Sequence, residues 1–318
     1  MKKYELGVAF SGGGAKGAAH VGAIQAMKEM ITLANSTITA QISEHGAELC
    51  SLVKEGRELL WTADKQYWGR HAPILFPIVG KVFGNRYRIG DAEFSLSQHG
   101  FARDSDFEVV SAEPQKCVLK LCSSESSRER YPFDFELVAT YTLEEDGIVC
   151  SWEVRNAGKV DMPCQIGGHP AFNYVDWPQG DGRGSLMILK GGRPLGSFVA
   201  TRISEGGCAL PGLEKVELRD GMMKLDSRTF DNGVFILEDG QCDEMRLISE
   251  AGETYLTLES KSPVFGIWAP EHKNPPFMCI EPWMGRTDPE GYCGQFDHKP
   301  WINILAPGAT LNFEYSLR

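Results

Sequence analysis

The chain has 318 residues, and its 32 basic against 43 acidic side chains give a formal net charge of −11. This balance excludes a basic footprint for nucleic acid, because the chain would repel a phosphate backbone. The nine cysteines include no Cys-x-x-Cys pair, which fits neither a disulfide framework nor a zinc ribbon and favours reduced thiols in the cytoplasm. No apolar stretch reaches the length of a membrane span, so no membrane partner is expected.

The first 29 residues differ from the rest of the chain. A strand is predicted over residues 4–10, then a glycine turn, then a helix over residues 18–30. Gly12, Gly14 and Gly17 complete a G-x-G-x-x-G pattern, whose backbone N–H groups can cradle an anion. A dinucleotide site is not expected, because the βαβ unit that should follow gives way to hairpin patterning.

The same segment resembles the opening of patatin-like lipid acyl hydrolases, in which this glycine loop is the oxyanion hole. The resemblance covers only residues 1–29. Acyl hydrolysis also needs a serine on a G-x-S-x-G elbow, and the chain has none. We therefore interpret residues 1–29 as a truncated leader or fusion segment, with a patatin-like hydrolase as the alternative.

From residue 30 onward the pattern is β-rich. Alternating runs predict strands at residues 36–42, 48–53, 117–122, 135–143, 147–154, 232–237, 254–258, 264–268, 277–280 and 310–315. No long amphipathic helix interrupts them, which favours one large antiparallel sandwich. The glycine- and proline-rich residues 176–196 are predicted to form a long surface loop.

Two of the seven histidines have glycine and aromatic neighbours. His99 stands in Gln-His-Gly-Phe-Ala-Arg, residues 98–103, and His169 in Gly-Gly-His-Pro, residues 167–170. The proline favours an extended backbone at His169, and the glycines let another group or a ligand approach closely. We interpret His169 as a strand-borne imidazole at an open site. The alternative for either ring is a hydrogen-bonded structural histidine.

An acidic residue, Glu281, ends an otherwise apolar run over residues 277–280. An unpaired carboxylate in such a run is costly to bury, so its pKa should rise unless donors surround it. A carboxyl group of raised pKa can serve as a base near neutral pH. The alternative is a plain salt bridge, for example with Arg286.

Taken in order, these stretches resemble the aldose 1-epimerase family of galactose mutarotase-like proteins, particularly its bacterial branch with Gln-His-Gly-Phe-Ala-Arg. Further matching pieces are His45-Gly-Ala-Glu-Leu49, Pro73-Ile-Leu-Phe-Pro-Ile-Val-Gly80, Tyr131-Pro-Phe133 and Phe230-Asp-Asn-Gly233. The resemblance runs through nearly all of residues 31–318. It implies one β-supersandwich domain over residues 30–318, with the histidines and the glutamate gathered in a cleft.

The resemblance also implies a reaction that needs neither metal nor cofactor. Glu281 would remove the proton of the anomeric hydroxyl while His169 gives a proton to the ring oxygen. The ring opens to the aldehyde, C1 turns about the C1–C2 bond, and reclosure yields the other anomer. His99 would hydrogen-bond and polarise the ring region. The side chains suit this chemistry, because a hemiacetal needs simultaneous proton removal and delivery.

The resemblance also suggests substrate contacts. Asp231 matches a family aspartate that contacts sugar hydroxyls, although an Asx turn explains it equally well. Gln98, beside His99, is also assigned to substrate binding. Arg103 suits a sugar phosphate, as in relatives that act on hexose 6-phosphates, or else a surface salt bridge.

The sequence does not settle which cation would contact the sugar. The family commonly has an arginine soon after Phe-Pro-x-Val-Gly, where this chain has Lys81, followed by Arg86 and Arg88. Lys81 and Arg86 are taken as candidates, and the sequence does not decide among the three. A lysine would supply a point charge instead of a planar fork. Trp177 and Trp283 are candidates either for stacking on a sugar face or for core packing.

The expected protein is thus a cytoplasmic isomerase, monomeric or homodimeric, whose partner is a small sugar. One alternative is a non-catalytic carbohydrate-binding or sensor protein on the same fold, and another is a hexose-6-phosphate mutarotase. A glycosidase is disfavoured because it needs two carboxylates across the scissile bond. A metal hydrolase is disfavoured because no H-x-x-x-H or H-x-H spacing occurs.

Overall fold

The computed structural model describes residues 30–177 and 182–318. The predicted βα extension and the patatin-like segment, residues 1–29, lie outside the described residues. Within the described part the named strands pair antiparallel throughout. The helical elements there are α2 (Glu125–Arg128), η2 (Phe83–Asn85), η3 (Ala102–Asp104) and η4 (Phe296–His298). The predicted all-β antiparallel class is confirmed, and no helix in these ranges is long and apolar enough to span a membrane.

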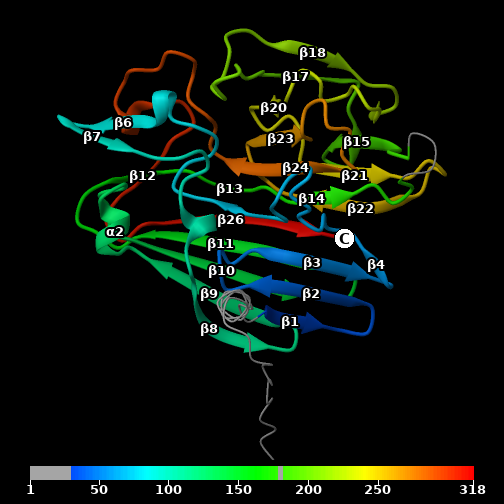
Figure 1. The fold of residues 1–318 in the computed structure, drawn as a ribbon, viewed down its shortest axis with the longest axis horizontal. Helices are drawn as coiled ribbons and strands as arrows, with labels where there is room; N and C mark the ends of the chain where they lie inside the picture. The colour runs from blue at the N-terminus through cyan, green and yellow to red at the C-terminus, as the bar shows by residue number, and fades with distance from the viewer. Residues whose placement is uncertain (1–29, 178–181) are drawn as a thin grey trace, which may run out of the picture.

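The largest sheet has ten strands and extends from β8 at the lower left of Figure 1 to β15 at the upper right. Its order is β16 (Arg193–Pro194), β15 (Ser185–Lys190), β21 (Glu244–Ile248), β22 (Thr254–Glu259), β26 (Thr310–Leu317), β11 (Ile148–Asn156), β10 (Phe135–Leu143), β9 (Lys116–Cys122) and β8 (Glu108–Glu113), with β19 (Met222–Lys224) on β15. Every second residue of β10 is buried, which is the period-two alternation of a sheet with one face on the core.

A six-stranded sheet carries Glu281, and His169 lies between two of its strands. Its order is β20 (Phe235–Leu237), β23 (Val264–Trp268), β24 (Phe277–Met284), β13 (Ile166–Gly168) and β5 (Ile74–Leu75), with β14 (Ala171–Asn173) also on β24. Burial along β24 is nearly continuous, because both of its faces are covered and its residues are mostly apolar. Any polar side chain on β24 therefore lies in a low-dielectric interior.

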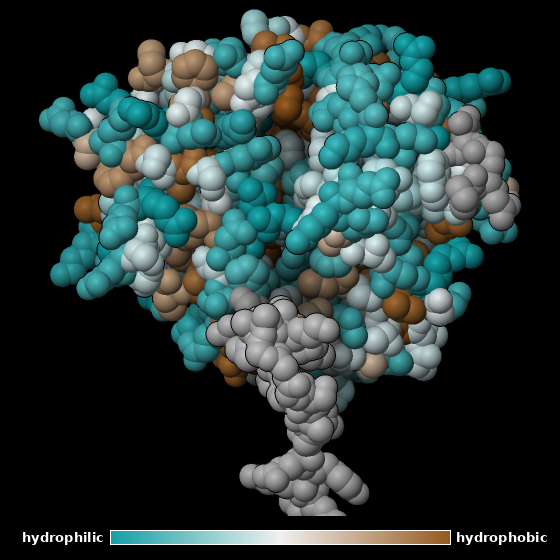
Figure 2. Space-filling view, viewed as in Figure 1, coloured by the Kyte–Doolittle hydropathy of each residue, from teal (hydrophilic) through white to brown (hydrophobic). Residues whose placement is uncertain are grey.

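The remaining strands form smaller sheets. A four-stranded sheet contains β1 (Met30–Ala34), β2 (Ile38–Ser43), β3 (Leu49–Lys54) and β4 (Arg57–Glu58), and the two-stranded sheets are β12 (Met162–Cys164) with β25 (Asn303–Leu305), β17 (Ser197–Ala200) with β18 (Glu214–Glu217), and β6 (Arg86–Ile89) with β7 (Ala92–Ser95). In Figure 1 the hairpins β6–β7 and β17–β18 lie at the rim of the molecule. Seen from the same side, the surface is mainly hydrophilic and is hollowed near the middle (Figure 2).

Two details differ from the sequence prediction. Glu281 does not end its strand, since β24 continues through Pro282, which lies opposite Phe265, to Met284. The prediction of a surface loop over residues 176–196 is wrong for residues 185–190, which form β15, and for residues 193–194, which form β16. The flanking glycines obscured this short strand, whose Leu186 and Ile188 alternate into the core.

The glycines before His169 allow close packing in the six-stranded sheet. A Cβ atom on Gly167 would lie 2.5 Å from Cδ1 of Trp283, and one on Gly266 would lie 2.5 Å from its Cη2. The indole of Trp283 therefore covers the backbone on both sides of β24. On Gly168 a Cβ atom would meet Tyr315 at 3.1 Å, on the side of the large sheet. The prediction that these glycines permit close approach is confirmed.

Replacing Gly167 by alanine should therefore destabilise the fold. The added methyl group has no space beside the indole of Trp283, and overpacking of this kind costs about 1–3 kcal/mol. Urea unfolding followed by circular dichroism should show a lower midpoint for Gly167→Ala. The matched control is Gly196→Ala, where nothing lies within 4 Å of the new atom. Equal midpoints for the two variants would contradict this packing.

Candidate active site

A cavity of about 850 Å³ gathers most of the predicted site residues, and those on its wall are Lys81, Gln98, His99, Arg103, His169, Asp231 and Glu281. Two predicted cations are elsewhere. Arg86 and Arg88 line a separate, smaller cavity, and Arg86 pairs with Glu93 at 2.9 Å on the β6–β7 hairpin. Of the three cations that the sequence left open, Lys81 alone lines the larger cavity.

The register of two neighbouring strands brings His169 and Glu281 together. Ala171 of β14 lies opposite Cys279 of β24, so His169, two residues earlier, comes level with Glu281. Nε2 of His169 and Oε2 of Glu281 are 3.1 Å apart. The side chains are deeply buried, with 6% and 2% of the two residues exposed. The alternative salt bridge does not form, because Arg286 pairs with Glu238 at 2.7 Å.

Burial controls the charge of this pair. It raises the pKa of Glu281 well above its usual value, and the neighbouring Trp283 opposes this shift. Burial also lowers the pKa of His169 to about 3, and the positive charges of Arg103 and Arg70 act in the same direction. Both shifts favour the uncharged forms, which are a protonated Glu281 beside a neutral imidazole.

The His169–Glu281 pair contains polar atoms that make no hydrogen bond. Among the described residues, Nδ1 of His169 and Oε2 of Glu281 have no hydrogen-bond partner. The 3.1 Å approach is thus a close contact that lacks hydrogen-bond alignment. Buried polar atoms without partners are destabilising, by about 1–3 kcal/mol each. A ligand carrying hydroxyl groups would relieve this cost.

His99 presents an N–H group to the cavity. Its Nδ1 lies 3.1 Å from the backbone N–H of Gly80, which donates to it. Burial, reinforced by His169, lowers the pKa of His99 well below its usual value, so the ring is neutral. A neutral ring that accepts at Nδ1 must carry its hydrogen on Nε2. The side-chain amide nitrogen of Gln98 lies 3.3 Å from Nε2 of His99.

The backbone around His99 is adapted to this position. His99 has φ 66° and Gly100 has φ 70°. A Cβ atom on Gly100 would lie 2.2 Å from the carbonyl oxygen of Phe76, so glycine is required there. A turn with positive φ at two successive residues therefore places His99 at the site.

Aromatic rings hold the His169 imidazole in place. Trp68 stacks on it with ring centroids 4.7 Å apart, and Trp268 contacts its edge at 5.6 Å. Sequence reasoning missed both tryptophans, which lie far from His169 along the chain. Of the two tryptophans proposed instead, Trp283 lines the cavity and Trp177 packs against Arg183 at 4.9 Å.

One end of the cavity is cationic. Arg70 pairs with Asp104 at 2.7 Å, and Arg103 lies 3.7 Å from the same carboxylate. Burial and the charge of Arg70 lower the pKa of Arg103 to about 10, which leaves it charged at neutral pH. Two guanidinium groups thus share one carboxylate, and Lys81 adds a third positive charge on the wall.

Part of the cavity wall is acidic. Asp231 lies 3.3 Å from Nδ1 of His272, and its side chain is 31% exposed. The backbone N–H of Gly233 donates to Phe230 O at 2.9 Å, so this turn is closed by the main chain. Glu271 on the same wall accepts from the indole N–H of Trp268 at 3.2 Å. Carboxylates of this kind are suitable acceptors for sugar hydroxyl groups.

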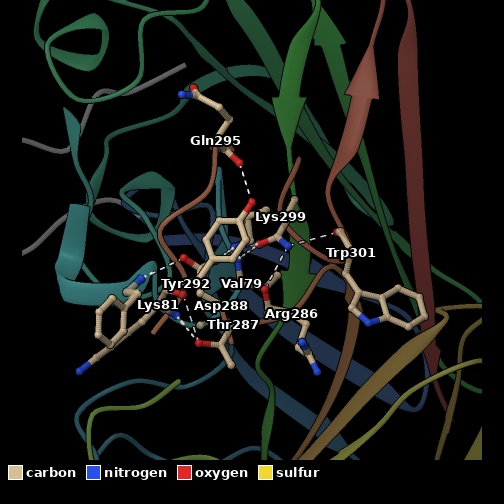
Figure 3. A network of polar contacts seen from close by, with 12 residues as sticks. Val79, Lys81, Arg286, Thr287, Asp288, Tyr292, Gln295, Lys299 and Trp301 are labelled. Carbon is tan, nitrogen blue, oxygen red and sulfur yellow. Dashed lines mark hydrogen bonds and ion pairs between the residues drawn. The ribbon is translucent and has the colours of Figure 1, made fainter. Parts of the chain in front are cut away.

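A polar network behind the cavity fixes residues 80–83 (Figure 3). Lys299 is buried and pairs with Asp288 at 2.8 Å, and Asp288 accepts the backbone N–H of Phe83 at 2.9 Å. Thr287 accepts the backbone N–H of Lys81 at 3.0 Å and donates to Gly207 O at 2.7 Å. The network therefore holds in place the segment whose Gly80 N–H sets the His99 tautomer.

Side chains that can ligate a metal also meet here. The ligand atoms of His169, Cys279 and Glu281 lie within 4.8 Å of one another. Within residues 30–177 and 182–318 this is the one such group found. Cys279 could not be recognised from the sequence, because an isolated cysteine in an apolar strand does not indicate a metal site.

Comparison with known proteins identifies the family. The family model for aldose 1-epimerase matches residues 29–191. A curated relative, the chromosomal protein LacX of Lactococcus lactis subsp. lactis, is 28% identical over 304 residues, covering 90% of this chain and 98% of that protein. The crystal structure of a galactose mutarotase-like protein from Lactobacillus casei is 32% identical, has a TM-score of 0.85 and covers 91% of this chain and 99% of its own. The structure of a galactose mutarotase related enzyme from Lactobacillus acidophilus is 29% identical and has a TM-score of 0.84. It covers 91% of this chain and 96% of its own. By its sequence and its fold, the chain belongs to the aldose 1-epimerase family.

Proposed function

We propose that the chain is an aldose 1-epimerase, which interconverts the α and β anomers of a hexose by opening and reclosing the ring. The observation that carries the proposal is the buried contact of 3.1 Å between His169 and Glu281 on the wall of a polar cavity. One proton shared by an acid and a base is what ring opening needs, because a proton leaves O1 as another arrives at O5.

In this mechanism the pair changes its proton arrangement without changing its total charge. Once a bound sugar has aligned the two groups, which lie 3.1 Å apart, transfer of the Glu281 proton to His169 gives a carboxylate and an imidazolium. Glu281 then accepts the proton of the anomeric hydroxyl, and His169 donates to the ring oxygen. On reclosure the two roles reverse, which restores the starting state.

Other residues position the sugar. The Nε2–H of His99 is oriented to donate to the ring region, since Nδ1 is occupied by the Gly80 N–H. Asp231 on the acidic wall offers acceptors to hydroxyl groups. Trp68 and Trp268 keep the His169 ring in one orientation and limit water around it.

A second candidate substrate class is a phosphorylated hexose. It is favoured by the cationic end of the cavity, where Arg70 and Arg103 share Asp104 and Lys81 lies nearby. A guanidinium fork suits a phosphate group, and the excess positive charge would offset its negative charge. The same acid/base pair would open either ring.

Anomer exchange should depend strongly on both members of the pair. His169→Asn and Glu281→Gln should each lower kcat by about 10²–10⁴-fold with a smaller effect on KM, because each removes a proton-transfer group. Magnetisation-exchange NMR on free hexoses and on hexose 6-phosphates, corrected for the buffer rate, measures this and identifies the preferred class.

Matched controls use the same substitutions at exposed positions, His45→Asn and Glu93→Gln, which should leave exchange unchanged. Sugar binding without exchange in the unmodified chain would instead indicate a non-catalytic carbohydrate-binding protein. An exchange rate equal to that of buffer across the whole panel would refute the proposed function.

The rate should also depend on pH in a particular direction. The active pair carries one proton, so kcat/KM should fall when acid adds a second proton and when alkali removes the last one. Because the pKa of His169 is lowered to about 3 and that of Glu281 is raised, the active form should span neutral pH. An acid limb near 6.5, the ordinary value for histidine, would show that His169 titrates as an exposed ring.

The tautomer of His99 should depend on the network that holds residues 80–83. Thr287→Val removes the hydrogen bonds to Lys81 and Gly207, so the Gly80 N–H should lose its fixed position. Imidazole ¹⁵N chemical shifts should change from a single Nε2–H tautomer to a mixture, and kcat should fall about tenfold. Thr287→Ser keeps the hydroxyl group and should preserve both the single tautomer and kcat. An unchanged His99 spectrum in Thr287→Val would argue against this role.

A further inference from the structure

Cys279 shares a face of β24 with Glu281. The two residues are separated by one position, and side chains at i and i+2 of a strand point to the same side. Cys279 is a free, fully buried cysteine in an apolar cluster with Trp61, Ala171 and Phe277. The proposed ring-opening reaction gives this thiol no role.

Three different ligand types meet at this point. One imidazole nitrogen of His169, the thiol of Cys279 and one carboxylate oxygen of Glu281 lie within 4.8 Å of one another. Among the described residues, Nδ1 of His169 and Oε2 of Glu281 lack hydrogen-bond partners, although both residues are more than nine-tenths buried. The group therefore combines metal-ligand chemistry with unused coordinating capacity.

The ligand types select a class of metal. A thiolate with an imidazole and one carboxylate suits Zn²⁺, whereas Mg²⁺ and Ca²⁺ prefer sites built from oxygen. We propose that His169, Cys279 and Glu281 form a binding site for Zn²⁺, and that the bound ion reversibly inhibits the enzyme. The binding stands by itself, whereas the inhibition rests on the proposed ring-opening function.

Charge supports the same site. Zn²⁺ would displace the proton of Cys279 and the proton of Glu281 to solvent, which leaves a thiolate, a carboxylate and a neutral imidazole around the ion. The complex then has no net charge, as a buried location requires. Burial and Glu281 raise the pKa of Cys279 well above its usual value, and a coordinated cation reverses that shift. The cavity reaches His169 and Glu281, which gives the ion a path to the site.

Inhibition follows from the coordination. The lone pairs that Zn²⁺ takes from His169 and Glu281 are those that exchange protons with the sugar, and the shared proton is lost. A metal-bound pair can neither accept the proton of O1 nor deliver one to O5. The fourth zinc position would face the cavity, where water or a sugar hydroxyl group could occupy it.

The binding test uses the full chain and two metals. Calorimetric titration with Zn²⁺ should give one site per chain, and Co²⁺ should give a thiolate-to-cobalt charge-transfer band. Cys279→Ser should remove the band and weaken Zn²⁺ binding about tenfold or more, since even outer-shell partners alter metal affinity by roughly 10–100-fold. Circular dichroism verifies that the variant folds, and Cys279→Ala is a second variant that leaves no ligand atom.

The matched control is Cys242→Ser, because Cys242 is also a free, buried cysteine but belongs to no group of possible metal ligands among the described residues. It should keep both the Co²⁺ band and the Zn²⁺ affinity. In the unmodified chain Zn²⁺ should slow anomer exchange, with recovery on addition of EDTA. Equal Zn²⁺ affinity in the unmodified chain and Cys279→Ser, or Co²⁺ bound without a thiolate band, overturns the site. Tight binding through Cys279 without slower exchange overturns the inhibition, and a chain without any exchange activity refutes the proposed function while the binding result still decides the site.

Discussion

The buried contact between His169 and Glu281 is the interaction on which the rest of the site depends. Their side chains approach to 3.1 Å in an interior that disfavours charge on either of them. That environment favours the uncharged forms of both groups, and it also makes the pair costly to hold without a ligand. A cavity that admits hydroxyl groups removes this cost, since a sugar supplies the missing hydrogen-bond partners. The same unused lone pairs make the site attractive to a zinc ion.

The surrounding structure is arranged to maintain this contact. β24 lies between β13 and β23, and glycines on these neighbours let Trp283 cover the backbone. Trp68 and Trp268 fix the plane of the His169 ring, while the buried pair of Lys299 and Asp288 fixes the segment that orients His99. The sheets thus fix the position of the acid/base pair, and residues outside the strands bring both cations and carboxylates to the cavity wall.

The sequence was informative where chemistry depends on local pattern. Alternating runs predicted most strands, and the Gly-Gly-His-Pro and apolar-Glu patterns, placed by family resemblance, predicted His169 and Glu281. It was uninformative where the site depends on contacts between residues that are far apart in the sequence. Trp68, Arg70 and Thr287 lie in irregular segments, and no periodicity connects them to the histidines. The sequence could not decide between Lys81 and Arg86, because the two are only five positions apart and yet line different cavities.

We expect this pair to hold one proton on Glu281 at neutral pH, next to a neutral His169. Infrared difference spectra of the unliganded chain against Glu281→Gln measure this directly, because a protonated carboxyl group has a carbonyl band distinct from the carboxylate bands. We predict that the protonated band of Glu281 is present at neutral pH, shifts in heavy water, and weakens when a sugar binds. A spectrum with only carboxylate bands for Glu281 in the empty site would contradict the account.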